Sequence, residues 1–226
     1  MLSSIFNNGW WILALLPLRL LALVVHEYSH GFVSSKLGDP TPRLRGRLTF
    51  NPLVHLDLYG TILMLLTGFG WAKPVEVNPM YYKDRKKGMA LVAFAGPISN
   101  FILAFLSLLI YVIFFVIAVY LKFPANIVDV VGTICSYSAQ INLCFMVFNL
   151  IPIPPLDGSR ILGMFLNNRL YYSLMQLERY SMILIIVMSI SGMFDSIIGG
   201  GVNLLYSGIA KLLINIVNIL LSWNLG

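Results

Sequence analysis

Five apolar runs, each long enough to cross a lipid bilayer, constrain this chain more than any other feature of its sequence. A transmembrane helix needs about 20 predominantly apolar residues, and such runs lie at about 10–35, 88–121, 127–151, 180–198 and 202–223. Only 11% of the 226 residues are charged and 58% are hydrophobic, which excludes an ordinary soluble domain. We therefore predict an all-α polytopic membrane protein with about five transmembrane helices.

The stretch 36–87 is the single sizeable polar insertion, and the sequence contains no internal repeat or separately folding soluble domain. We expect one membrane-embedded domain over 1–226, with a core at about 10–165 and C-terminal helices at about 176–223. The first residues carry no basic segment and no small-residue cleavage site, so the first apolar run is expected to be retained. Loop lysines and arginines account for the net charge of +6, and no nucleic-acid partner is expected.

One part of the insertion has two interpretations. Residues 55–71 form a sixth apolar run, but it is short, carries Asp57 near its start and is broken by glycines, so a re-entrant or membrane-edge segment competes with a crossing. The following residues, WAKPVEVNP, alternate apolar and polar side chains between prolines. This alternation predicts a short edge strand in a β-hairpin-like loop.

Positive charges favour the first interpretation. If 55–71 does not cross, only Lys122 is clearly opposite the other loop cations, and Arg19 and Lys211 lie inside crossings. The cations that then share one side are Lys36, Arg43, Arg45, Arg47, Lys73, Lys83, Arg85, Lys86, Lys87, Arg160, Arg169 and Arg179. Because Lys and Arg accumulate on the cytoplasmic side of membrane proteins, we predict five crossings, an outside N-terminus and a cytoplasmic loop 36–87.

The sequence LALVVHEYSHGFV places three ionisable residues inside the first crossing. On a helix His26 and His30 project from one face, where two imidazoles can bind one zinc ion, and Glu27 lies within reach of a metal-bound water. A lone buried histidine is usually a hydrogen-bonded structural residue. Inside a membrane, however, such groups are costly without partners and mark functional sites, so we predict a zinc centre.

Two histidines leave tetrahedral zinc short of a third protein ligand. The strongest candidate is Asp157 in FNLIPIPPLDGSRIL. Pro152, Pro154 and Pro155 forbid a regular helix, so the third crossing ends in extended backbone at membrane depth. Such backbone is tolerated only where it is buried in protein or lines a wet cavity. A simple helix stop and a transporter-like broken helix are the alternatives.

Membrane topology also favours Asp157 as the third ligand. In the arrangement with five crossings, the first and third crossings run in the same direction, so Asp157 reaches the depth of the two histidines. His55 and Asp57 are weaker candidates because they lie beside a predicted turn at Asn51–Pro52.

Two asparagines and one loop segment are further candidates. Asn100 and Asn149 either support helix packing and satisfy freed carbonyls, or present an amide to a substrate carbonyl. The residues Val75, Glu76 and Val77 offer a strand edge to an extended substrate or form a cap at the membrane surface.

Three motifs, HEYSH at 26–30, AGPISN at 95–100 and NLIPIPPLDG at 149–158, together resemble the signature of the site-2 protease family of intramembrane zinc metalloproteases. The resemblance covers about residues 10–165 and is strongest with compact members that lack an inserted peptide-binding domain. It implies a general base, a zinc ion with three protein ligands, and polar assistance in the cleft. The residues in these roles would be Glu27 as base, His26, His30 and Asp157 as ligands, and Asn100 and Asn149 as polar groups.

The expected function is hydrolysis of a peptide bond within or next to a transmembrane segment of another protein. The expected partners are such substrates and the lipid bilayer. A compact chain with cytoplasm-facing charges suits a bacterial or archaeal plasma membrane, with the active site near the cytoplasmic side. Two alternatives are a zinc-binding transporter or sensor, which usually shows paired broken segments in two related halves, and an inactive scaffold that binds membrane helices.

Overall fold

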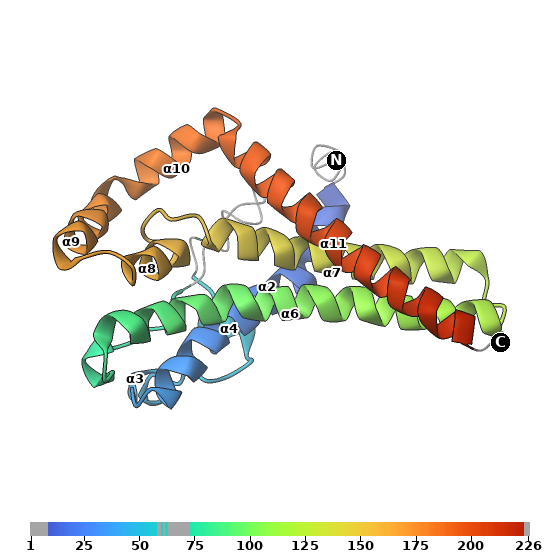
Figure 1. Ribbon diagram of the computed structural model, residues 1–226, viewed down its shortest axis with the longest axis horizontal. Helices are drawn as coiled ribbons and strands as arrows, with labels where there is room; N and C mark the ends of the chain where they lie inside the picture. The colour runs from blue at the N-terminus through green and yellow to red at the C-terminus, as the bar shows by residue number, and fades with distance from the viewer. Residues whose placement is uncertain (1–8, 58–59, 61, 63–72, 224–226) are drawn as a thin grey trace.

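The computed structural model of the chain describes residues 9–57, 60, 62 and 73–223, and the regular elements in this part are helices, without a β-strand (Figure 1). The long helices are α2 (Gly9–Lys36), α6 (Arg85–Tyr120), α7 (Ala125–Asn149) and α11 (Met193–Trp223). The short elements are α3 (Thr41–Leu44), α4 (Pro52–His55), η1 (Pro79–Tyr81), α8 (Asp157–Gly163), α9 (Asn168–Gln176), η2 (Leu177–Tyr180) and α10 (Ser181–Ile190).

Within the described residues, three helices are long and apolar enough to cross a membrane: α6, α7, and α11 over Met193–Ile219. The antiparallel helices α6 and α7 lie side by side, and α11 runs across them (Figure 1). Their contact is a cluster of small and branched apolar side chains, namely Ala104, Leu108, Ala139, Leu143, Ile209 and Leu213. The alanines let the backbones approach closely, as small residues do between membrane helices.

The C-terminal third of the chain differs from the prediction. We expected separate crossings at 180–198 and 202–223, but α10 has ten residues, about 15 Å, which is half of a bilayer core. The break lies at Gly192, whose φ of 71° suits glycine, and α11 then continues without interruption through Gly199, Gly200 and Gly201. Five crossings are therefore not confirmed, and the end of α11 lies near the α6–α7 turn (Figure 1).

The predicted strand in the loop before α6 is not confirmed either. Residues 73–78 have no regular secondary structure, because two of their backbone N–H groups bond to carboxylates rather than to a strand. Val75 N–H donates to Glu27 at 2.9 Å, and Asn78 N–H donates to Asp39 at 2.7 Å. Most of the predicted re-entrant segment 55–71 lies outside the described residues.

The two halves of the polar insertion lie against each other. Asp39 is 1% exposed and also accepts hydrogen bonds from the Ser34 hydroxyl at 2.7 Å and Thr41 N–H at 2.9 Å. On the surface Arg45 forms an ion pair with Glu76 at 3.1 Å. These contacts join residues 34–45 to residues 76–78.

Candidate metal centre

Helix α2 presents two imidazoles whose Nδ1 atoms already have partners. On α2 the rings of His26 and His30 lie 4.6 Å apart, as the spacing of four residues predicts. Nδ1 of His26 is 2.7 Å from Oδ1 of Asn100, and Nδ1 of His30 is 2.7 Å from the carbonyl oxygen of Val92. Because each acceptor holds a proton on Nδ1, the lone pair of each Nε2 is left for a metal ion.

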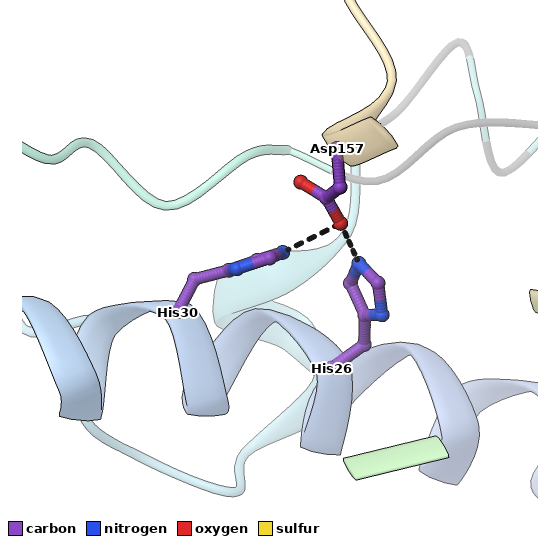
Figure 2. Close-up of side chains that lie close together, drawn as sticks. All are labelled: His26, His30 and Asp157. Atoms are coloured by element: carbon purple, nitrogen blue, oxygen red, sulfur yellow. Dashed lines mark ion pairs between the residues drawn. The ribbon is translucent and has the colours of Figure 1, made fainter. Parts of the chain in front are cut away.

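The turn that follows α7 brings Asp157 to the same place. α7 ends at Asn149, a proline-rich turn follows, and Asp157 begins α8. Figure 2 shows one carboxylate oxygen of Asp157 facing both rings, 3.2 Å from Nε2 of His26 and 3.3 Å from Nε2 of His30. In the described part of the chain this buried Oδ2 atom has no hydrogen-bond partner. Three electron-pair donors therefore converge on one point.

These three residues fit a zinc ion. Two ligand atoms of tetrahedral zinc, each about 2.0 to 2.1 Å from the metal, lie about 3.3 to 3.4 Å apart, which is close to both measured separations. Among the described residues, His26, His30 and Asp157 are the one group of His, Cys, Asp and Glu side chains close enough to share a metal ion. His55 does not join them; it is fully buried and its Nε2 lies 2.8 Å from Thr49 O.

Two glycines make room for this arrangement. A Cβ atom on Gly96 would lie 2.5 Å from Cε1 of His26 and 2.6 Å from Nε2 of His30. A Cβ atom on Gly158 would lie 2.2 Å from the carbonyl oxygen of Leu150. Both distances are shorter than atoms tolerate, so the glycines of the AGPISN and PPLDG motifs are required by the close approach of α6 and α8 to their neighbours.

Glu27, which follows His26 in the sequence, forms a hydrogen bond with the loop before α6. Oε2 of Glu27 accepts the Val75 N–H hydrogen bond, and the side chain is half-buried. Val75 is 8% exposed and packs beside Gly31, one turn further along α2. A carboxylate in this position is suited to accept a proton from a water molecule at the metal.

Behind the rings lies a chain of buried amides. The Asn100 side chain is fully buried and uses all of its groups: Oδ1 faces His26, while Nδ2 donates to Ala22 O at 3.1 Å and to Asn142 Oδ1 at 2.9 Å. Asn142, 2% exposed, donates in turn to Ser138 O at 2.9 Å. Sequence reasoning missed Asn142, although it lies two helical turns before Asn149 and therefore on the same face of α7.

A family model described as Peptidase family M50 matches residues 14–193. The chain belongs to this family, the site-2 protease family of intramembrane zinc metalloproteases. The match includes all three motifs and all three candidate ligands, so the resemblance noted in the sequence is confirmed.

Curated relatives of this M50 protein carry consistent names. It is 38% identical to "Putative zinc metalloprotease YwhC" of Bacillus subtilis over 80% of this chain and 84% of the relative. It is 30% identical to "Putative zinc metalloprotease Rip2" of Mycolicibacterium smegmatis, over 76% of this chain and 64% of the relative. It is 29% identical to "Zinc metalloprotease MJ0392" of Methanocaldococcus jannaschii, over 75% and 39%. No solved structure matches the M50 chain significantly.

The remaining predicted site residues of this M50 protein are Asn149, Glu76 and Val77, and they differ in how many of their polar groups have partners. Asn149 Nδ2 donates to Phe145 O at 3.1 Å within its own helix, which uses one of its two amide hydrogens. Glu76 is exposed and paired with Arg45. In the described part of the chain, the backbone of Val77 forms no hydrogen bond with another backbone group outside the helices.

Proposed function

We propose that this protein is a zinc metalloendopeptidase that hydrolyses peptide bonds within or next to transmembrane segments of other membrane proteins. The observation that carries the proposal is the convergence of His26, His30 and Asp157 from α2 and from the start of α8, with Glu27 next to His26 in the sequence of α2. Zinc held by these three residues supplies a Lewis acid for the scissile carbonyl and acidifies a bound water.

The side chains of this protein perform the proton transfers. Glu27 takes a proton from the attacking water and donates it to the leaving amine, which is the general acid-base role. The Val75 N–H fixes the carboxylate orientation during both transfers. The hydrogen bonds at Nδ1 hold His26 and His30 in the tautomer that leaves Nε2 unprotonated.

Substrate contacts come from groups that the resting structure leaves available. Asn149 retains one amide hydrogen that a substrate carbonyl can accept. The Val77 backbone is suited to pair with an extended substrate, as in strand addition. Asn100 acts on the reaction through His26, because its amide is fully occupied by protein groups.

The expected partners are membrane proteins with a transmembrane segment, in contact with the lipid bilayer. We place the enzyme in a bacterial or archaeal plasma membrane because relatives occur in Bacillus subtilis and Methanocaldococcus jannaschii. The loop cations support an active site near the cytoplasmic side. Cysteine labelling at positions Arg45 and Lys86 from the cytoplasmic side tests this orientation, and labelling of both from outside would contradict it.

The test of the proposed activity uses the purified full chain in detergent or lipid with a panel of membrane-helix peptides. Wild-type protein is expected to cut at least one peptide, a chelator such as 1,10-phenanthroline to stop cleavage, and added zinc to restore it. Glu27→Gln is expected to keep one zinc per chain and to lose turnover, because the amide preserves shape without a base.

The same assay separates the alternatives. A transporter or sensor would bind zinc in both proteins and cut nothing, and an inactive scaffold would bind peptides without cleavage. Loss of zinc in Glu27→Gln would show that Glu27 is a ligand and would contradict the proposed mechanism. Full zinc occupancy in Asp157→Ala would contradict the third-ligand assignment.

A further inference from the structure

A pocket of about 420 Å³ lies on the loop side of the protein, outside the metal centre. Its walls come from the chain around α4 and from the segment that leads into Val75. Three of its lining side chains are cationic, one is acidic and three are apolar: Arg45, Arg47, Lys73, Glu76, Leu53, Val54 and Leu56. The pocket therefore has both a charged and an apolar wall.

Arg47 is a buried cation that lines this pocket. It is 5% exposed, and its guanidinium donates to the carbonyl oxygen of Val54. No carboxylate pairs with it in the described part of the chain. A buried cation without a counter-ion is costly, so an anion in the pocket would stabilise it.

The net charge of the pocket also favours an anion. Glu76 is already paired with Arg45 at 3.1 Å, which leaves Arg47 and Lys73 uncompensated. Lys73 is exposed and its backbone N–H, not its ammonium group, donates to His55 O at 2.8 Å, so the ammonium group can turn to a ligand. Two uncompensated cations suit one phosphate diester.

The apolar wall distinguishes a lipid from a free anion. Leu53 is 75% exposed and lines the pocket, and the nearby Phe50 is 60% exposed and stacks on Tyr28 of α2 at 4.3 Å. Exposed large apolar side chains next to cations are the pattern of a segment that lies in the membrane interface. A free phosphate would leave these side chains in water, whereas glycerol and acyl groups would cover them.

We propose that this pocket binds the headgroup of an anionic phospholipid, with the phosphate at Arg47 and Lys73 and the glycerol and first acyl carbons against Leu53. The site does not depend on the proposed protease activity. It does adjoin it, because Lys73 and Glu76 flank Val75, whose N–H holds Glu27. A bound lipid therefore fixes the segment that positions the base.

Lipid binding to the intact Glu27→Gln protein tests the proposal without any contribution from turnover. Native mass spectrometry in detergent compares phosphatidylglycerol with phosphatidylcholine of the same acyl chains. Phosphatidylglycerol is expected to bind more tightly, and Lys73→Gln to weaken it about fivefold, as expected for one cation near a membrane surface. Arg47→Gln is expected to weaken it at least as much. The matched control is Arg43→Gln, an exposed cation of the same loop outside the pocket, which should change nothing.

Several results would overturn the proposal. Equal binding of the two lipids would mean that the pocket does not recognise the negative charge. An equal loss in Arg43→Gln and Lys73→Gln would show a diffuse attraction instead of a site. Displacement of phosphatidylglycerol by millimolar inorganic phosphate or by a short acidic peptide would assign the pocket to those ligands. Because Lys73 is exposed, Lys73→Gln is expected to fold, and it tests the proposal even if Arg47→Gln does not fold.

Discussion

The backbone N–H of Val75 donates a 2.9 Å hydrogen bond to Oε2 of Glu27, across 48 residues of sequence. The sequence predicts Val75 as part of an edge that receives substrate and Glu27 as the base, but not that the two would touch. The contact makes the loop before α6 a positioning element for the base. A substrate that pairs with Val77 would therefore approach the backbone that orients the carboxylate of the proposed base.

The first prediction removes this donor. Val75→Pro lacks an N–H group but fits an extended segment, and we expect kcat to fall about tenfold or more because a hydrogen bond to a charged group is lost. Val75→Ala keeps the N–H and should retain kcat close to the wild type. Unchanged zinc content in both variants would show that the metal centre is intact. Equal kcat values for the two variants would contradict a positioning role for the backbone of Val75.

The second prediction concerns the space beside the imidazoles. In Gly96→Ala the new methyl group would overlap both His26 and His30, so the rings must move and zinc should bind about 10-fold to 100-fold more weakly. Gly132→Ala is the matched control, since its Cβ would meet Tyr111 at 2.8 Å away from the metal ligands. A similar zinc affinity in both variants, measured by competition with a chromogenic chelator, would argue against Gly96 as a determinant of the site.

The convergence of the three candidate ligands was predictable because local geometry determines most of their placement. His26 and His30 share a helix face whatever the rest of the chain does. Asp157 needed one further step, the topology argument that the first and third crossings run in the same direction, and its contact with both rings agrees with that argument. His26, His30 and Asp157 also stood out as site candidates because the sequence around them is apolar.

Other features depend on contacts that no local pattern encodes. Asn142 is one of several polar residues in α7, and its burial follows from where α6 and α7 touch. The predicted runs 180–198 and 202–223 place the boundary at residues 199–201, whereas the helix break lies at Gly192. Gly201 instead packs against Val147, where a Cβ would lie 2.9 Å away, so that glycine serves helix packing.

The third prediction compares how much the buried amides of Asn100 and Asn142 contribute to zinc affinity. Asn100→Leu removes the acceptor at His26 Nδ1 and should weaken zinc binding about 10-fold to 100-fold. Asn142→Ala removes only a partner of Asn100 and should have a smaller effect in the same direction. Ser107→Ala, which breaks a 2.9 Å bond to Ser138 on the same two helices, is the control for stability. Zinc loss that tracks the melting temperature across all three variants would reduce both asparagines to a structural role.

The fourth prediction is a pH dependence of the loop. Burial raises the pKa of Asp39, but the hydrogen bonds from Thr41, Asn78 and Ser34 outweigh burial and lower it below the usual value. A carboxyl group whose pKa is lower in the folded state stabilises the fold above its unfolded pKa, near 4, and this stability is lost as pH falls through the folded pKa.

We therefore expect the melting temperature of the wild type to fall below about pH 4. In Asp39→Asn this acid-dependent component should be missing, and in Ser34→Ala it should be smaller. Thermal unfolding between neutral pH and pH 3 measures it. A steeper loss in Asp39→Asn than in the wild type would reverse the sign of the argument.

The last prediction concerns the conformation of the substrate. In a membrane helix each carbonyl accepts a hydrogen bond from an amide four residues on, and side chains surround the backbone, so a scissile carbonyl cannot reach the ligand set of His26, His30 and Asp157. Cleavage needs local unwinding, which exposes unpaired groups at a cost of several kcal/mol each in lipid. Gly, Pro or Asn near the cut site should lower that cost and raise the rate, while Leu or Ala should slow it. Matched peptides that differ only at these positions, assayed in detergent and in lipid, measure the effect. Equal rates, with chemistry shown to be rate-limiting, would mean that the bond is cut in a segment that is already extended.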